Sequence, residues 1–86
     1  MTLNELRKKI DAVDNEILRL FEMRQALSAR IGICKQEAGL PVLDVQRQEE
    51  KLAALCEKAA PENRAAVARL FAELMALSRA RQEGTL

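Results

Sequence analysis

Apolar side chains recur at alternating steps of three and four residues along the first 34 positions, which is the period of one face of an α-helix. Thr2, with Glu5 three residues later, fits a helix N-cap, and Gly39 followed by Pro41 fits a helix end. The pattern therefore predicts one helix over residues 3–38. The ten positions of its seam are Leu3, Leu6, Ile10, Val13, Ile17, Leu20, Arg24, Leu27, Ile31 and Cys34.

A helix of this length does not fit inside a compact domain of 86 residues. At 1.5 Å per residue it is about 50 Å long, whereas a globule of this size is about 30 Å across. Part of the apolar seam must extend beyond the chain's own core, and a second copy related by a two-fold axis offers the same apolar surface. We therefore expect an intertwined homodimer.

Two shorter helices are predicted in the second half of the chain. Asp44 can cap a helix over about 44–59, and a third helix over about 61–83 accommodates Pro61 in its first turn. No strand pattern or repeat interrupts this order, so the sequence predicts a single all-α domain over residues 1–86. The inward faces of the shorter helices are expected to contain Val45, Leu52, Leu55, Cys56, Val67, Leu70, Phe71, Leu74 and Leu77.

Composition excludes several classes of function. The hydrophobic share of 49% beside 31% charged residues is typical of a folded protein, and no apolar run approaches the roughly 20 residues of a membrane span. The first residues lack the pattern of a signal peptide, so a cytoplasmic location is expected. A formal net charge of +1, with no Tyr or Trp, disfavours nucleic-acid binding.

Histidine is absent, which removes the usual general base near neutral pH and the commonest metal ligand. Cys34 and Cys56 lack the spacing of a metal site or a disulfide framework. Both fall at apolar positions of the helical patterns, so we expect them to be small core residues. No metal or cofactor is expected, and any chemistry must proceed without one.

Arg24 is the one charged residue of the seam, where burying an unpaired charge is costly. Either it meets an anionic ligand, or it reaches solvent or pairs with a structural carboxylate. Lys35 lies about 20° around the helix and about 16 Å along it, so both cations face one surface and could bracket a small dianion. Between them, Gly32 costs about 1 kcal/mol relative to alanine, which close approach of a ligand or of another helix would compensate.

The shorter helices add further polar side chains at helical spacings. Asp44, Arg47 and Gln48 share one face of the first turn of the second helix. Ser78 and Gln82 lie four residues apart, where the third helix turns polar. Taken alone, the first group fits ordinary helix capping and the second fits a solvated helix end.

Together, these residues resemble the AroQ chorismate mutases over nearly the whole chain. Members of that family fold as three helices that interlock into a dimer, and each active site borrows one arginine from the other chain's long helix. The resemblance implies conversion of chorismate to prephenate in aromatic amino-acid biosynthesis, without a cofactor. Some relatives carry a fused prephenate-processing domain, and the sequence leaves open whether this chain is free-standing. The positions that carry the resemblance are residues 6–14, Arg24, residues 32–35, residues 41–47, Ser78 and Gln82.

The resemblance implies how the carboxylates of chorismate would be held. Arg7 resembles the arginine that is donated to the partner's site, and it lies about 100° around the helix from the face of Arg24. By resemblance, Arg7, Arg24 and Arg47 bind the two carboxylates, and Ser78 adds a hydrogen bond.

The resemblance also assigns the groups around the breaking bond. Lys35 and Gln82 would bind the ether oxygen, so these two residues and Arg24 are the expected catalytic groups. Gln48 stands where many members carry a glutamate that accepts a hydrogen bond from the ring hydroxyl, and an amide carbonyl can also accept it. Asp44 would contribute through its backbone or only as a helix cap.

Two other functions remain open at this point. Isochorismate pyruvate lyase uses the same frame with similar cations, although the full set of polar residues favours the mutase. A catalytically silent helical module for dimerisation or regulation would keep the apolar seam. Arg24 argues against this second alternative, because a purely structural dimer would gain stability from an aliphatic residue there.

Overall fold

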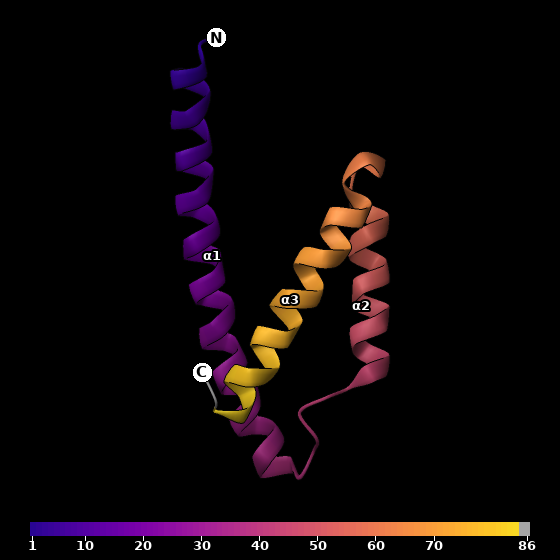
Figure 1. Ribbon diagram of the computed structural model, residues 1–86. Coiled ribbons are helices and arrows are strands. Elements are labelled where there is room, and N and C mark those ends of the chain that lie inside the picture. Colours follow the sequence, from indigo (N-terminus) through magenta and orange to yellow (C-terminus); the bar gives the residue numbers. More distant parts are fainter. Residues whose placement is uncertain (85–86) are drawn as a thin grey trace.

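The computed structural model describes residues 1–84, which form three α-helices and one short 3₁₀ turn (Figure 1). The all-α fold with a very long first helix, predicted from the apolar pattern, is confirmed. The elements are α1 (Leu3–Ala38), α2 (Val45–Lys58), η1 (Pro61–Asn63) and α3 (Arg64–Glu83).

Local capping sets both ends of α1, as expected from the sequence. The Thr2 hydroxyl accepts a hydrogen bond from the backbone N–H of Glu5 at 3.1 Å, and the Glu5 carboxylate accepts one from the backbone of Thr2. At the other end Gly39 has a φ of 69°, a left-handed conformation that glycine adopts without steric cost. Its backbone N–H donates to the carbonyl oxygen of Gln36 at 3.2 Å.

The third helix begins later than predicted. Residues 61–63 form a 3₁₀ turn and not the first turn of an α-helix, with the backbone N–H of Asn63 donating to the carbonyl of Ala60 at 2.9 Å. Pro61 fits the start of this turn because its missing N–H would have no partner there. The α-helical part of this segment therefore starts at Arg64.

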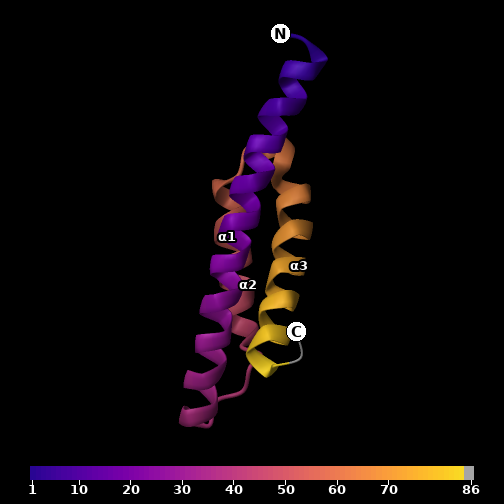
Figure 2. The same cartoon turned by 90° about the vertical axis from the view of Figure 1, so that its left-hand side faces the viewer.

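The helix α3 crosses between the other two and packs on both, whereas the backbones of α1 and α2 do not approach each other. Figures 1 and 2 show the N-terminal end of α1 extending beyond the rest of the chain, and Figure 1 shows the turns that follow it standing apart from α2 and α3. The radius of gyration is 15.9 Å and the longest dimension is 54 Å. A compact chain of this length would have a radius of gyration of about 12 Å, so the fold is far from globular.

A single chain has almost no interior of its own. Among the described residues, Met75 on α3 is the one buried hydrophobic side chain, and it is still 6% exposed. The predictions of an inward Val45 and Leu70 are wrong for one chain, in which 54% and 55% of these residues is exposed. Cys34 is also exposed and not a core residue, while Cys56 is half-buried. The reason is that the backbone of α2 approaches α3 and not α1. The faces of these helices that point away from α3, or away from α1 and α2, are therefore not covered by another helix of the same chain.

The N-terminal half of the α1 seam has no partner within the chain. Its six apolar residues are between 47% and 62% exposed. Exposed apolar surface costs about 25 cal/mol per Å² relative to burial, so a continuous stripe of this kind favours association. Within the described part of the chain, no helix combines the length and apolarity needed to cross a membrane. The six residues are Leu3, Leu6, Ile10, Val13, Ile17 and Leu20.

Candidate active site

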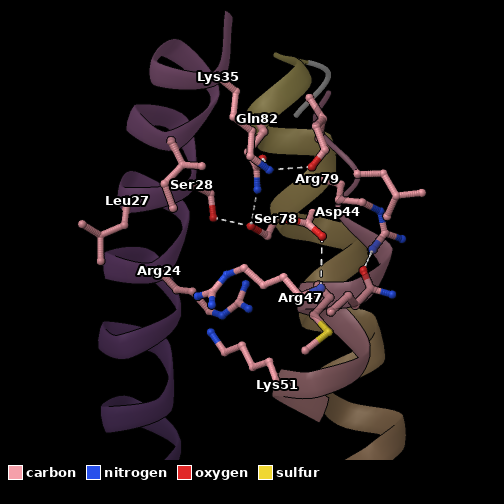
Figure 3. A pocket seen from close by; sticks show the side chains of 15 residues that line it. Arg24, Leu27, Ser28, Lys35, Asp44, Arg47, Lys51, Ser78, Arg79 and Gln82 are labelled. Atoms are coloured by element: carbon pink, nitrogen blue, oxygen red, sulfur yellow. Dashed lines mark hydrogen bonds between the residues drawn. The ribbon is translucent and has the colours of Figure 1, made fainter. Parts of the chain in front are cut away.

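A cavity of about 290 Å³ lies between α1, α2 and α3 and contains most of the polar residues singled out in the sequence (Figure 3). Arg24 and Lys35 line the same cavity, as their helical spacing predicted. Leu27, Ile31 and Met75 supply part of its apolar wall. The expected site residues brought together here are Arg24, Lys35, Asp44, Arg47, Gln48, Ser78 and Gln82.

Arg7 is the one expected site residue that does not line this cavity. It lies on α1 seventeen positions before Arg24, which is about 26 Å along a helix axis. Residue 7 belongs to the first turns of α1, the segment that extends beyond α2 and α3 in Figure 1. Within one chain, Arg7 therefore cannot act in the cavity that contains Arg24.

Gly32 allows α1 and α3 to approach closely at one end of the cavity. A Cβ atom at this position would lie 2.4 Å from the carbonyl oxygen of Gln82 and 2.8 Å from its Cα. Both atoms belong to the backbone of α3, so of the two explanations left open by the sequence, helix packing accounts for the glycine. This contact brings Gln82 beside Lys35, since both residues flank the same crossing point.

Replacing Gly32 with alanine should lower the free energy of unfolding by about 1–3 kcal/mol, because the backbone of α3 must move to relieve the clash. The better helix propensity of alanine, worth about 1 kcal/mol, offsets only part of this cost. Urea denaturation followed by circular dichroism measures the change. Gln36→Ala, at an exposed site on the same helix, is the matched control. A Gly32→Ala protein as stable as wild type would contradict the close approach.

A connected set of hydrogen bonds orients the donors at this end of the cavity. The Lys35 ammonium donates to the Val42 carbonyl at 2.6 Å and to the Gln82 side-chain oxygen at 2.9 Å. The Gln82 amide then donates to the Ser78 hydroxyl at 3.1 Å, and the hydroxyls of Ser78 and Ser28 are 2.6 Å apart. An ammonium has three N–H groups and a side-chain amide two, so Lys35 and Gln82 each retain one donor for a ligand.

Ser28, which lies between Arg24 and Lys35 on α1, supports this set of hydrogen bonds. It is 3% exposed, and its hydroxyl lies in the contact between α1 and α3. Its burial fixes the hydroxyl of Ser78, which in turn accepts from Gln82. The donors at this end are therefore held by helix packing before any ligand arrives.

Arg24 lies half-buried at the other end of the cavity. One of its terminal nitrogens donates to the carbonyl oxygen of Leu74 at 2.9 Å. No carboxylate of residues 1–84 forms an ion pair with it, so the structural-carboxylate alternative does not apply within this part of the chain. Burial lowers the pKa of the guanidinium below its usual range, which shows that its charge is incompletely solvated. Arg24 therefore has a half-buried positive charge that an anionic ligand in the cavity could neutralise.

Two cations of α2 converge on Arg24. The side chains of Arg47 and Lys51 point toward its guanidinium in Figure 3. Burial, and then the charges of Arg24 and Arg47, lower the pKa of the Lys51 ammonium. Sequence reasoning missed Lys51, although a signal was present: positions 44, 47, 48 and 51 follow the i, i+3, i+4, i+7 spacing of one helix face.

The remaining polar residues of α2 are already engaged. The Asp44 carboxylate accepts a hydrogen bond from the backbone N–H of Arg47 at 3.1 Å, which is an ordinary N-cap. The Gln48 side-chain oxygen accepts a hydrogen bond from Arg79, a second cavity residue that the sequence did not reveal. A carbonyl oxygen has two lone pairs, so Gln48 can still accept one further hydrogen bond.

The electrostatic character of the cavity follows from its charged side chains. It contains five cationic side chains and one carboxylate, which is a formal charge of +4. In the described part of the chain, no cluster of His, Cys, Asp or Glu could hold a metal ion. The arrangement suits a small organic anion with more than one acidic group. The cations are Arg24, Lys35, Arg47, Lys51 and Arg79, and the carboxylate is Asp44.

Comparisons with known proteins agree with this geometry. The model of the family described as chorismate mutase type II matches residues 6–83. The chain is 50% identical over 48 residues to the bifunctional chorismate mutase/prephenate dehydratase of Aquifex aeolicus, a match covering 56% of this chain and 13% of that protein. It is 36% identical over 59 residues to a chorismate mutase of Methanocaldococcus jannaschii, covering 65% of this chain and 60% of the relative.

A third relative is the T-protein of Haemophilus influenzae, which is 37% identical over 46 residues, covering 54% of this chain and 12% of that protein. The matched stretches thus span less than two thirds of each of the three relatives. No solved structure matches the chain significantly.

Proposed function

The chain belongs to the chorismate mutase type II family, and from this membership we propose that it converts chorismate to prephenate. The reaction is an intramolecular rearrangement, so it requires no nucleophile, no metal and no obligatory proton transfer. A histidine-free chain can perform it with fixed charges and hydrogen-bond donors alone. The observation that carries the proposal is the cavity with two oriented donors at one end and a group of cations at the other.

Lys35 and Gln82 are the proposed groups at the ether oxygen of chorismate. Negative charge develops on that oxygen as its bond to the ring carbon breaks, so donors aimed at it stabilise the transition state more than the ground state. Each of the two side chains has one donor left after its contacts within the protein. Their fixed orientation means that little reorganisation accompanies the chemical step.

Arg24 and Arg47 are proposed to hold the carboxylates of chorismate, with Ser78 adding a hydrogen bond. Binding both carboxylates in one cavity holds the enolpyruvyl side chain over the ring, which reduces the entropy lost on the way to the transition state. Leu27 and Ile31 on α1 offer an apolar wall for the ring. Gln48 would accept a hydrogen bond from the ring hydroxyl with its second lone pair.

We further propose that the active form is an intertwined homodimer in which Arg7 enters the partner's cavity. The exposed apolar stripe on the first half of α1 supports this assembly, because burial against a second copy would remove it from water. The lack of backbone contact between α1 and α2 supports it as well, since the cavity remains open on that side. Arg7 lies on the overhanging segment, so a partner helix is the means by which it could reach a cavity.

The proposal is tested with the purified chain by following loss of chorismate and appearance of prephenate. A parallel assay for pyruvate release from isochorismate distinguishes the lyase, and sedimentation equilibrium gives the oligomeric state. Prephenate formation by a species of about twice the 9.6 kDa chain mass is the expected result. A folded dimer that turns over neither substrate would instead indicate a silent helical module.

A further inference from the structure

Three cationic side chains, Arg24, Arg47 and Lys51, meet at one end of the cavity. The resemblance assigned carboxylate binding within one chain to the two arginines and gave no role to Lys51. We propose that the ammonium group of Lys51 binds a substrate carboxylate together with Arg24 and Arg47. This inference rests on the proposed function and adds a substrate-binding residue to it.

The position of Lys51 supports this role. It follows Arg47 by four residues on α2, so both side chains leave the same face of the helix. Figure 3 shows its side chain extending across the cavity toward Arg24 on α1. No carboxylate of residues 1–84 forms an ion pair with Lys51, so its charge is not committed to a structural contact there.

The charges around Lys51 also favour an anion between these residues. From α1 it faces Arg24, and from its own helix Arg47, while Lys35 lies at the opposite end of the cavity. The single carboxylate of the cavity, Asp44, already accepts a hydrogen bond from a backbone N–H. From α3, Arg79 adds another cation that is hydrogen-bonded to the uncharged side chain of Gln48.

Lys51 is an exposed residue, yet its side chain extends into the cavity toward the two arginines (Figure 3). Partial burial, and then the charges of Arg24 and Arg47, lower the pKa of its ammonium, because both effects disfavour the charged form. A bound carboxylate would reverse this effect, because an opposite charge favours the protonated form of lysine.

The pH dependence follows from this. Protonated Lys51 binds the carboxylate, and binding weakens as the pH rises through its lowered pKa in the free protein. The KM for chorismate should therefore rise on the alkaline side in the wild-type protein. Arginine stays protonated throughout this range, so Lys51→Arg should shift the rise in KM to higher pH.

The first experiment compares Lys51→Met with wild type in steady-state kinetics. We expect KM for chorismate to rise about tenfold at pH 7, as for loss of one partly screened charge-assisted contact, with kcat changed less than about twofold. Lys58→Met, at an exposed site near the end of the same helix, is the matched control with unchanged kinetics. If the wild type is active and Lys51→Met keeps its KM and pH profile, the inference about Lys51 is wrong. The proposed mutase activity is not affected by that result.

A second measurement does not depend on turnover. Competitive acetylation with acetic anhydride, followed by peptide mass spectrometry, reports the reactivity of Lys51 with and without chorismate. Chorismate is expected to raise the pKa of Lys51 and slow its acetylation, without an effect at Lys58. Lack of protection at Lys51 overturns the inference, whereas a folded wild type that binds chorismate at Lys51 without forming prephenate overturns the proposed activity alone.

Discussion

Replacing Arg24 with methionine is expected to lower kcat/KM for chorismate by about 10²- to 10³-fold without lowering the melting temperature. The loss in activity corresponds to about 3–4 kcal/mol, typical of removing one partner of a desolvated charge pair. The stability of the free protein should not fall, because no carboxylate of the described residues compensates the half-buried guanidinium. Methionine fills similar space without a charge, which offsets the lost hydrogen bond to Leu74 of about 1 kcal/mol.

Thermal unfolding and steady-state kinetics of the same preparations test both halves of this expectation. Arg24→Lys serves as the matched variant, since it retains the charge but loses the planar pair of donors, and it should keep more activity than Arg24→Met. A lower melting temperature combined with normal kinetics in Arg24→Met would show that Arg24 is structural and does not contact the substrate.

Two nearly inactive variants should regain about a quarter of the wild-type activity when they are unfolded together in equal amounts and refolded. In the proposed dimer, a cavity uses Arg24 of one chain and Arg7 of the other. A hybrid of Arg7→Met and Arg24→Met therefore contains one intact cavity and one that lacks both arginines. Random pairing makes about half of the dimers hybrids, each with one working site of two.

The mixing experiment is measured as prephenate formation per chain, with native mass spectrometry to count the hybrids. Each variant refolded with itself is the blank, and Lys8→Met, the neighbour of Arg7 on the exposed helix, should retain wild-type activity. Hybrids that form without regained activity would show that Arg7 does not serve the partner's cavity. Full activity of Arg7→Met by itself would lead to the same conclusion.

Both ends of α1 and the start of α2 were predictable because they depend on residues that are close in sequence, whereas the start of α3 was placed too early. The capping pair of Thr2 and Glu5, the left-handed Gly39 and the cap at Asp44 are all where the sequence placed them. The shared surface of Arg24 and Lys35 was predictable for the same reason, since helical geometry alone relates two residues of one helix.

Contacts between helices were harder to predict because they depend on crossing angles. The spacing within α2 places Lys51 on the face of Arg47, but only the packing of α2 and α1 on α3 shows that this face meets Arg24. Arg79 belongs to the cavity through the same packing. Gly32 had two equally good explanations until the backbone of Gln82 was placed against it. The exposure of Val45 and Leu70 likewise reflects which faces of one chain remain uncovered.

The nearly empty interior of the single chain has a thermodynamic consequence. Met75 is the one buried hydrophobic side chain of the described residues, so most of the free energy that keeps these helices folded would come from association. Folding and dimerisation would then be one coupled equilibrium. Its melting temperature and its denaturant midpoint would both rise with protein concentration. Dilution alone would then unfold the helices that form the cavity, without any change in pH, ligand or sequence.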